Sequence, residues 1–133
     1  MRLLIIAPNY IDFIKGLVNA EAKYLEDVNV LIHHNRLVEF AKYLPASGYL
    51  GFVKFFTKEK LIDVNKKPEN VNVNIVSTLY FIPDSRNIGL GEKIANKFER
   101  YLRERRIEFD LIHAHFTWPC GYVGVKLAQK FDV

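Results

Sequence analysis

Apolar residues along the chain gather into short runs separated by amphipathic or polar stretches. The first run, residues 3–7, is continuous, and a second continuous run follows at residues 28–32. Runs of this length are typical of parallel strands covered on both faces. Between them Val18, Ala22 and Leu25 recur at helical spacing, which predicts a helix. The beginning of the chain is therefore predicted to form a βαβ unit.

The second half of the chain continues this alternation. Residues 71–82 begin with period-two alternation and then become mainly apolar, as expected for a strand that enters a core. A polar loop is predicted at 83–90, and apolar positions across 94–102 mark one face of a long helix. A fourth strand is predicted at 111–115 and a last helix at 120–131.

This order of elements predicts the α/β class: a Rossmann-like three-layer domain with a mainly parallel sheet in the order 3-2-1-4. The 133 residues suffice for a single domain, residues 1–133. Another strand would normally follow the last helix, so we expect a truncated fold. Residues 36–64 are less regular and are predicted to be a helical insertion.

The insertion contains an aromatic and basic segment that has two interpretations. A pattern typical of a surface that touches a membrane is formed by Phe52, Phe55 and Phe56 beside Lys54, Lys58 and Lys60. The segment is short for a stable interfacial helix, so packing of these aromatics onto the sheet is the favoured interpretation.

Composition narrows the function classes only slightly. Hydrophobic residues make up 50% and charged residues 26% of the chain, as in ordinary globular domains. The net charge of +4 favours anionic partners without choosing among them. The basic stretch at 98–106 is interrupted by glutamates and lacks a stacking platform, so we expect no nucleic-acid partner. One cysteine and no run of 18 apolar residues predict a cytoplasmic location.

The predicted strand order places a ligand site beyond the carboxyl ends of the first and fourth strands. Three segments should meet there, at residues 8–16, 33–36 and 116–121. The first segment holds only Gly16 of a dinucleotide fingerprint, and no phosphate-binding Lys-Ser/Thr motif is present. Dinucleotide oxidoreduction and ATP hydrolysis are therefore disfavoured.

For two further chemistries, metal binding and cysteine catalysis, the sequence offers incomplete sets of residues. His113 and His115 lie on one face of a strand, but catalytic zinc usually takes three protein ligands and no third is singled out. We therefore expect no metal; His113 is predicted to be a core residue and His115 a polar crevice group. Cys120 stands in a first helical turn, where a dipole lowers a thiol pKa, yet burial against the sheet is favoured over nucleophilic catalysis.

The last predicted helix begins with a possible anion-binding turn. Thr117 is predicted to cap the helix, Pro119 suits its first turn, and Gly121 leaves backbone N–H groups open to a ligand oxygen. Trp118 offers a flat face to a sugar ring or an acyl group, or packs under a loop. Both alternatives stay open.

Four stretches together resemble the N-terminal domain of family 4-type GT-B glycosyltransferases: MRLLIIAPNY…KG, VNVLIHH, VNVNIVSTLYFIP and FDLIHAHFTWPCGYVGVKLAQKFDV. The resemblance implies transfer of a glycosyl group from a nucleotide-sugar donor to a sugar or lipid acceptor, with no cofactor or required metal. This domain would supply the acceptor side of a cleft. A second Rossmann-like domain would hold most of the donor nucleotide, so this chain alone should be inactive.

The same resemblance implies which residues face the cleft. The loop after the first strand would contact donor phosphates and acceptor, and the turn after the fourth strand would line the cleft, with the end of the second strand beside them. The residues concerned are Asn9, Tyr10, Lys15, Gly16, His33, His115, Phe116, Thr117 and Trp118. The family loop often has two adjacent glycines and this chain has one. The catalytic residues are unassigned.

Two alternatives accompany this hypothesis. The chain could be a stand-alone α/β binding module for a phosphorylated or glycosylated ligand, without enzymatic activity. Peripheral contact with the inner membrane face through the aromatic and basic segment is compatible with either hypothesis.

Overall fold

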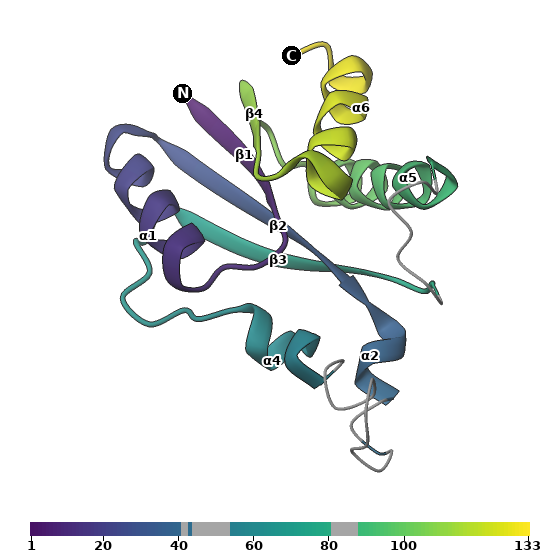
Figure 1. Cartoon of the computed structure of the whole chain (residues 1–133). Coiled ribbons are helices and arrows are strands. Elements are labelled where there is room, and N and C mark those ends of the chain that lie inside the picture. The colour runs from purple at the N-terminus through teal and green to yellow at the C-terminus, as the bar shows by residue number, and fades with distance from the viewer. Residues whose placement is uncertain (41–42, 44–53, 81–87) are drawn as a thin grey trace.

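A parallel sheet of four strands forms the centre of the computed structural model, which describes residues 1–40, 43, 54–80 and 88–133 (Figure 1). The strands lie in the order β3-β2-β1-β4 and all neighbouring pairs are parallel. Their bounds are Arg2–Ala7 for β1, Asp27–Asn35 for β2, Val71–Thr78 for β3 and Leu111–Ala114 for β4. The predicted class and strand order are confirmed: the fold is a Rossmann-like α/β domain.

Helices cover both faces of the sheet (Figure 1). α1 (Asp12–Glu21), continued by the 3₁₀ turn η1 (Ala22–Tyr24), covers one face together with α4 (Lys58–Leu61). α5 (Ile88–Arg105) and α6 (Tyr122–Phe131) pack together on the other face. The remaining elements among the described residues are α2 (Arg36–Phe40), the 3₁₀ turn η3 (Lys54–Phe56) and the π-helical turn η4 (Thr117–Gly121).

The apolar runs of the strands divide between two cores because successive side chains point to opposite faces of a sheet. Leu4 and Ile6 of β1 pack with the α5 and α6 side chains, whereas Leu3, Ile5 and Ala7 pack with α1. Both faces of β1 are thus buried, which explains its continuous apolar sequence.

α6 approaches β4 closely through a glycine. A Cβ added at Gly124 would lie 3.0 Å from the Cβ of Ala114. Because both residues are small, the backbone of α6 packs closely against the edge strand β4.

Several element boundaries differ from the sequence predictions. β2 extends to Asn35 because its end pairs with Val76–Thr78 of β3, and β3 ends at Thr78 instead of residue 82. α5 begins at Ile88, inside the predicted polar loop, and its first turn buries Leu90 in the core. Tertiary pairing and packing decided these boundaries, which local patterns leave open.

The predicted insertion at 36–64 contains α2, η3 and α4 among its described residues. The expectation that its aromatics pack onto the sheet is wrong for Phe55 and Phe56, which are 63% and 46% exposed; Phe52 lies outside the described residues. Leu61 of α4 fills the core position instead, and its carbonyl accepts a hydrogen bond from the Tyr10 N–H at 2.7 Å. None of the helices within the described ranges could cross a bilayer.

Candidate functional site

Four buried polar atoms without a hydrogen-bond partner lie at the carboxyl ends of the strands, within the described part of the chain. They are Asn9 Oδ1 after β1, His33 Nε2 in β2, Thr78 Oγ1 at the end of β3 and His115 Nε2 after β4. We call these residues the carboxyl-edge cluster. Parallel strands end at one edge of a sheet, and ligands of open α/β sheets bind there. Buried polar atoms are normally paired, so four unpaired atoms at this edge mark a candidate binding site.

His33 contributes a neutral imidazole. Its ring stacks on Tyr80 with centroids 5.3 Å apart and an interplanar angle of 19°. Burial, with a smaller contribution from the charge of His34, lowers the pKa of His33 to about 4. The ring is therefore uncharged near neutral pH and suits hydrogen bonding to an uncharged group such as a hydroxyl.

His115 contributes a second imidazole from the opposite face of the sheet. Its backbone N–H donates to Ile6 O at 2.9 Å, and the side chain is buried. Burial and the neighbouring His113 lower the pKa of His115, and Glu21 opposes them. The ring centroids of His113 and His115 lie 4.4 Å apart, and His113 Nδ1 lies 3.4 Å from Glu21 Oε1.

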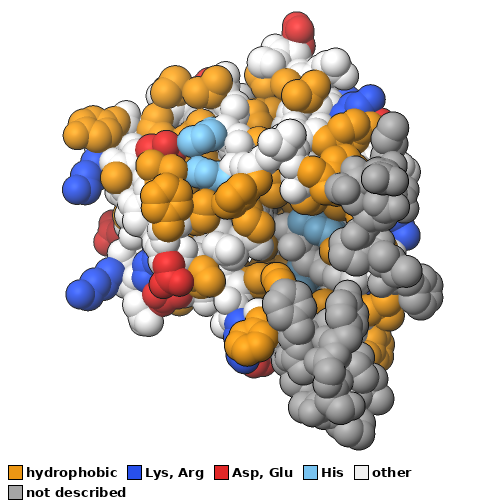
Figure 2. All heavy atoms as spheres, viewed as in Figure 1, with side chains coloured by type: hydrophobic (Ala, Val, Ile, Leu, Met, Phe, Trp, Pro, Cys, Tyr) orange, Lys and Arg blue, Asp and Glu red, His pale blue; other side chains and the backbone are white. Residues whose placement is uncertain are grey.

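The prediction that His113 is a core residue is wrong, whereas the prediction that His115 is a polar crevice group stays a prediction. The His113 side chain is 39% exposed, whereas His115 as a residue is 8% exposed. β4 is an edge strand, and α1 on this face packs over β1 and β2, so His113 borders solvent. Figure 2 shows histidine side chains reaching the surface next to hydrophobic ones on the viewed face. Among the described residues, no three His, Cys, Asp or Glu side chains are arranged to hold a metal ion.

The turn after β4 satisfies its own backbone. The Gly121 N–H donates to Phe116 O at 2.9 Å, and a Cβ at Gly121 would lie 3.0 Å from that oxygen. Phe116 occupies the N-cap position with φ 68°, and η4 has no side-chain cap. The prediction that Thr117 caps the helix is therefore wrong, and the N–H of Gly121 itself is not among the backbone groups open to a ligand oxygen. Phe116 and Thr117 are exposed beyond the end of β4.

Trp118 is half-buried and packs against Tyr122 of α6 and Gly91 of α5. Its ring centroid lies 5.5 Å from that of Tyr122, and a Cβ at Gly91 of α5 would lie 2.9 Å from its Cη2. The peptide bond between Trp118 and Pro119 is cis. These contacts favour the packing alternative for Trp118 over a free sugar-binding face.

The loop after β1 contributes less than the resemblance implies. Tyr10 is fully buried, and its hydroxyl donates to Asn19 Oδ1 at 2.5 Å. Lys15 Nζ lies 2.6 Å from Asp63 Oδ2, and hydrogen bonding to Lys15 lowers the pKa of that carboxyl. Gly16 borders open space, so the domain itself requires no glycine there. Of the four predicted residues in this loop, Asn9 is the one with an unpaired side-chain atom.

Cys120 is a packing residue. Its side chain belongs to the core beneath α5 and α6, and burial raises its pKa to about 12. The thiol therefore stays protonated at neutral pH and is a poor nucleophile.

The sequence did not predict Thr78 or Glu21 as site residues. Thr78 had no direct signal, because the third strand was predicted to extend to residue 82, which placed Thr78 inside the strand and not at its end. Glu21 had none, because its partner His113 lies on a strand far along the chain.

Comparison with protein-family models, curated proteins and solved structures found no match. The functional argument therefore depends on the residues and geometry of the chain itself.

Proposed function

We propose that this chain is the acceptor-side domain of a glycosyltransferase that uses a nucleotide-sugar donor and works in the cytoplasm. The observation that carries the proposal is the carboxyl-edge cluster. Sugar hydroxyls both donate and accept hydrogen bonds, so they can pair with amide, imidazole and hydroxyl groups that lack partners. The sequence resemblance to GT-B glycosyltransferases adds the reaction, in which a glycosyl group is transferred from a nucleotide-sugar donor to the bound acceptor.

Each member of the cluster has a role under this proposal. Asn9 Oδ1 accepts a hydrogen bond from an acceptor hydroxyl, and the neutral rings of His33 and His115 bind further hydroxyls through Nε2. The Thr78 hydroxyl completes the polar lining, and the exposed ring of Phe116 contacts an apolar part of the acceptor. Buried groups that are paired only when the acceptor is bound favour sugars over apolar molecules.

The donor would bind mainly to a second domain. Lys15, the predicted phosphate contact of this chain, is engaged with Asp63, and its side chain is 15% exposed. Stabilisation of the leaving phosphate would then come from the other side of the cleft, where charge develops in the transition state.

Titration of ¹⁵N-labelled chain with methyl glucoside and octyl glucoside tests acceptor binding. We expect saturable shifts confined to the backbone amides of Asn9, His33, Thr78 and His115. Thr78→Val removes the unpaired hydroxyl while keeping the side-chain shape, so affinity should fall about tenfold without loss of stability. Thr57→Val, at a second buried threonine, is the matched control and should bind like the wild type. Shifts centred elsewhere, or equal affinity of both variants, would contradict the proposal.

A parallel titration with UDP-glucose and GDP-mannose separates the proposal from the stand-alone binding module. The split cleft predicts weak donor binding by this chain, with Kd above about 1 mM, equivalent to a binding free energy weaker than about −4 kcal/mol. Tight saturable binding of a nucleotide-sugar to the chain alone would favour the binding module.

We also propose that the acceptor is presented at a membrane surface. Phe40 of α2 and Phe55 of η3 are 65% and 63% exposed, and Lys60 Nζ lies 4.7 Å from the Phe55 ring centroid. Exposed aromatics beside lysines are typical of contact with anionic headgroups.

Co-sedimentation with phosphatidylcholine vesicles, with and without phosphatidylglycerol, tests this contact. We expect binding to the anionic vesicles that weakens as salt rises. The double variant Phe55→Ser, Phe56→Ser should lose it, and Phe13→Ser, which changes a 75% exposed residue on α1, should retain it. Equal sedimentation with both vesicle types at all salt concentrations would refute the contact.

A further inference from the structure

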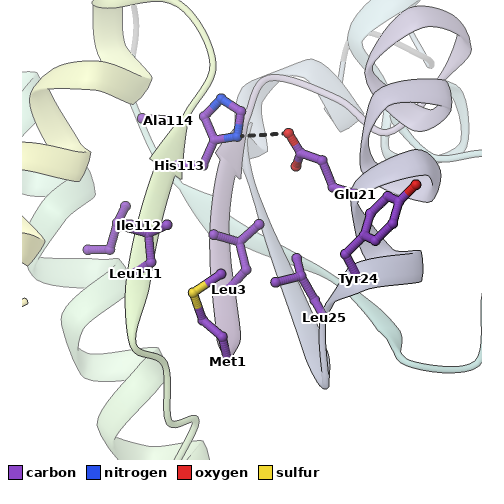
Figure 3. A pocket seen from close by; sticks show the side chains of 9 residues that line it. All are labelled: Met1, Leu3, Glu21, Tyr24, Leu25, Leu111, Ile112, His113 and Ala114. Carbon is purple, nitrogen blue, oxygen red and sulfur yellow. Dashed lines mark ion pairs between the residues drawn. The ribbon is translucent and has the colours of Figure 1, made fainter.

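A groove of about 500 Å³ lies on the α1 side of the sheet, and its lining residue His113 is the neighbour of His115 in the carboxyl-edge cluster. Leu3 of β1 forms its floor, Leu25 and Tyr24 stand on one side, and Leu111 of β4 stands on the other (Figure 3). The groove exists because α1 and η1 pack over β1 and β2 but not over the edge strand β4. Leu111 is consequently 48% exposed.

One end of the groove is polar. His113 and Glu21 reach across the floor and meet there, as Figure 3 shows, and their contact is an ion pair only when His113 is protonated. His113 Nδ1 faces Glu21 Oε1, and the second carboxylate oxygen, Oε2, is buried without a hydrogen-bond partner. A buried acceptor left unpaired destabilises the fold, and more so when it is charged. A ligand that donates a hydrogen bond at this end would relieve that destabilisation.

We propose that the groove is a binding site for a small apolar molecule that carries a protonated amine. The volume lies within the range of about 300–1,000 Å³ usual for small-molecule sites. The leucines take the apolar body, and Glu21 Oε2 accepts a charge-assisted hydrogen bond from the amine. This site is independent of the proposed glycosyltransferase function.

The choice of an amine follows from the charge at the polar end. Glu21 supplies a carboxylate, so an anionic head group would meet repulsion and a neutral one would lack the ion pair. Hydrogen bonds to charged groups are also stronger than hydrogen bonds between neutral groups. The groove should therefore rank an amine above an alcohol, and an alcohol above a carboxylate, of equal chain length.

Octylamine, 1-octanol and octanoate are suitable probes, each titrated into ¹⁵N-labelled chain at pH 7. We expect octylamine to shift the backbone amides of Leu3, Leu25, Leu111 and His113, and to bind about tenfold more tightly than octanoate. Equal affinity for the three probes, or shifts spread over the whole surface, would identify adventitious apolar binding and overturn the proposal.

Two pairs of variants locate the binding. Glu21→Gln removes the charge and should abolish the preference for octylamine, whereas Glu69→Gln, at an exposed glutamate of the β2–β3 connection, should leave it unchanged. Leu111→Asn should weaken octylamine binding, and Val125→Asn, at a 59% exposed residue of α6, should not. Retained amine preference in Glu21→Gln would refute the assignment.

The experiment separates this site from the proposed function. Thr78→Val should bind octylamine like the wild type, and Leu111→Asn should bind glycosides like the wild type. Loss of both ligands in either variant, with an unchanged fold by circular dichroism, would contradict the independence of the two sites.

Discussion

Replacing Tyr10 by phenylalanine tests whether this residue stabilises the core or binds a ligand. The ring is fully buried beside α1, and its hydroxyl donates to Asn19 Oδ1 at 2.5 Å. Phenylalanine keeps the packing and removes the hydrogen bond. The net worth of such a bond is about 0.5–1.5 kcal/mol, and the unpaired Asn19 oxygen adds a penalty that half-burial reduces. We expect the free energy of unfolding to fall by about 2 kcal/mol.

Urea unfolding followed by circular dichroism measures this change. The midpoint of Tyr10→Phe should decrease while the denaturant dependence stays constant, which identifies a change in stability. Tyr24→Phe is the control, because Tyr24 is 88% exposed and its hydroxyl should contribute less than about 0.5 kcal/mol. Glycoside affinity should be the same in both variants. Unchanged stability of Tyr10→Phe together with lost glycoside binding would refute the core assignment.

Three further predictions concern the pH dependence of stability, alanine substitution of two helical glycines and the reactivity of the cysteine. The pKa of His33 is about 4 when folded, against 6.5 for the free group, so the unfolded chain binds the extra proton between these pH values. Stability should fall by up to about 3 kcal/mol as pH decreases from 6.5 to 4, and urea midpoints of His33→Gln across this range should show a flatter decline. The new methyl group of Gly16→Ala meets open space in α1, so helix propensity should raise the free energy of unfolding by about 0.5–1 kcal/mol and with it the melting temperature. The new methyl group of Gly91→Ala would lie 2.6 Å from the Tyr122 ring, so the free energy of unfolding and the melting temperature should fall, the former by about 1–3 kcal/mol. Cys120 should react with Ellman's reagent at pH 8 only after denaturation, and rapid reaction of the native chain would contradict its burial.

The fold was largely predictable because the apolar pattern of each strand reflects how its two faces are buried. β1 and β2 are buried on both faces, so their sequences are continuously apolar, and β3 shows alternation where it is partly exposed. Strand order follows from connection rules that hold for parallel sheets in general. The boundaries were less predictable, since the end of β2 depends on pairing with β3 and the start of α5 depends on burial of Leu90.

The candidate site was only partly predictable. The carboxyl-end rule selected the segments that contain Asn9 and His33 and the turn that follows His115, but it could not distinguish a side chain that faces a cleft from one that enters the core. Tyr10 and Trp118 follow the same strand ends and are engaged in packing. Periodicity does not settle such cases in a loop, because loop side chains have no fixed direction.

The sequence by itself determined the α/β class, the parallel sheet and the edge at which polar residues collect. Apolar runs and helical spacing are local properties, and the order of parallel strands constrains where their ends meet. Only the tertiary structure decided which polar atoms stay unpaired, that Lys15 is committed to Asp63, and that Glu21 meets His113 across the groove. These pairings join residues far apart in the chain, and they depend on side-chain directions that are fixed only when the helices pack on the sheet.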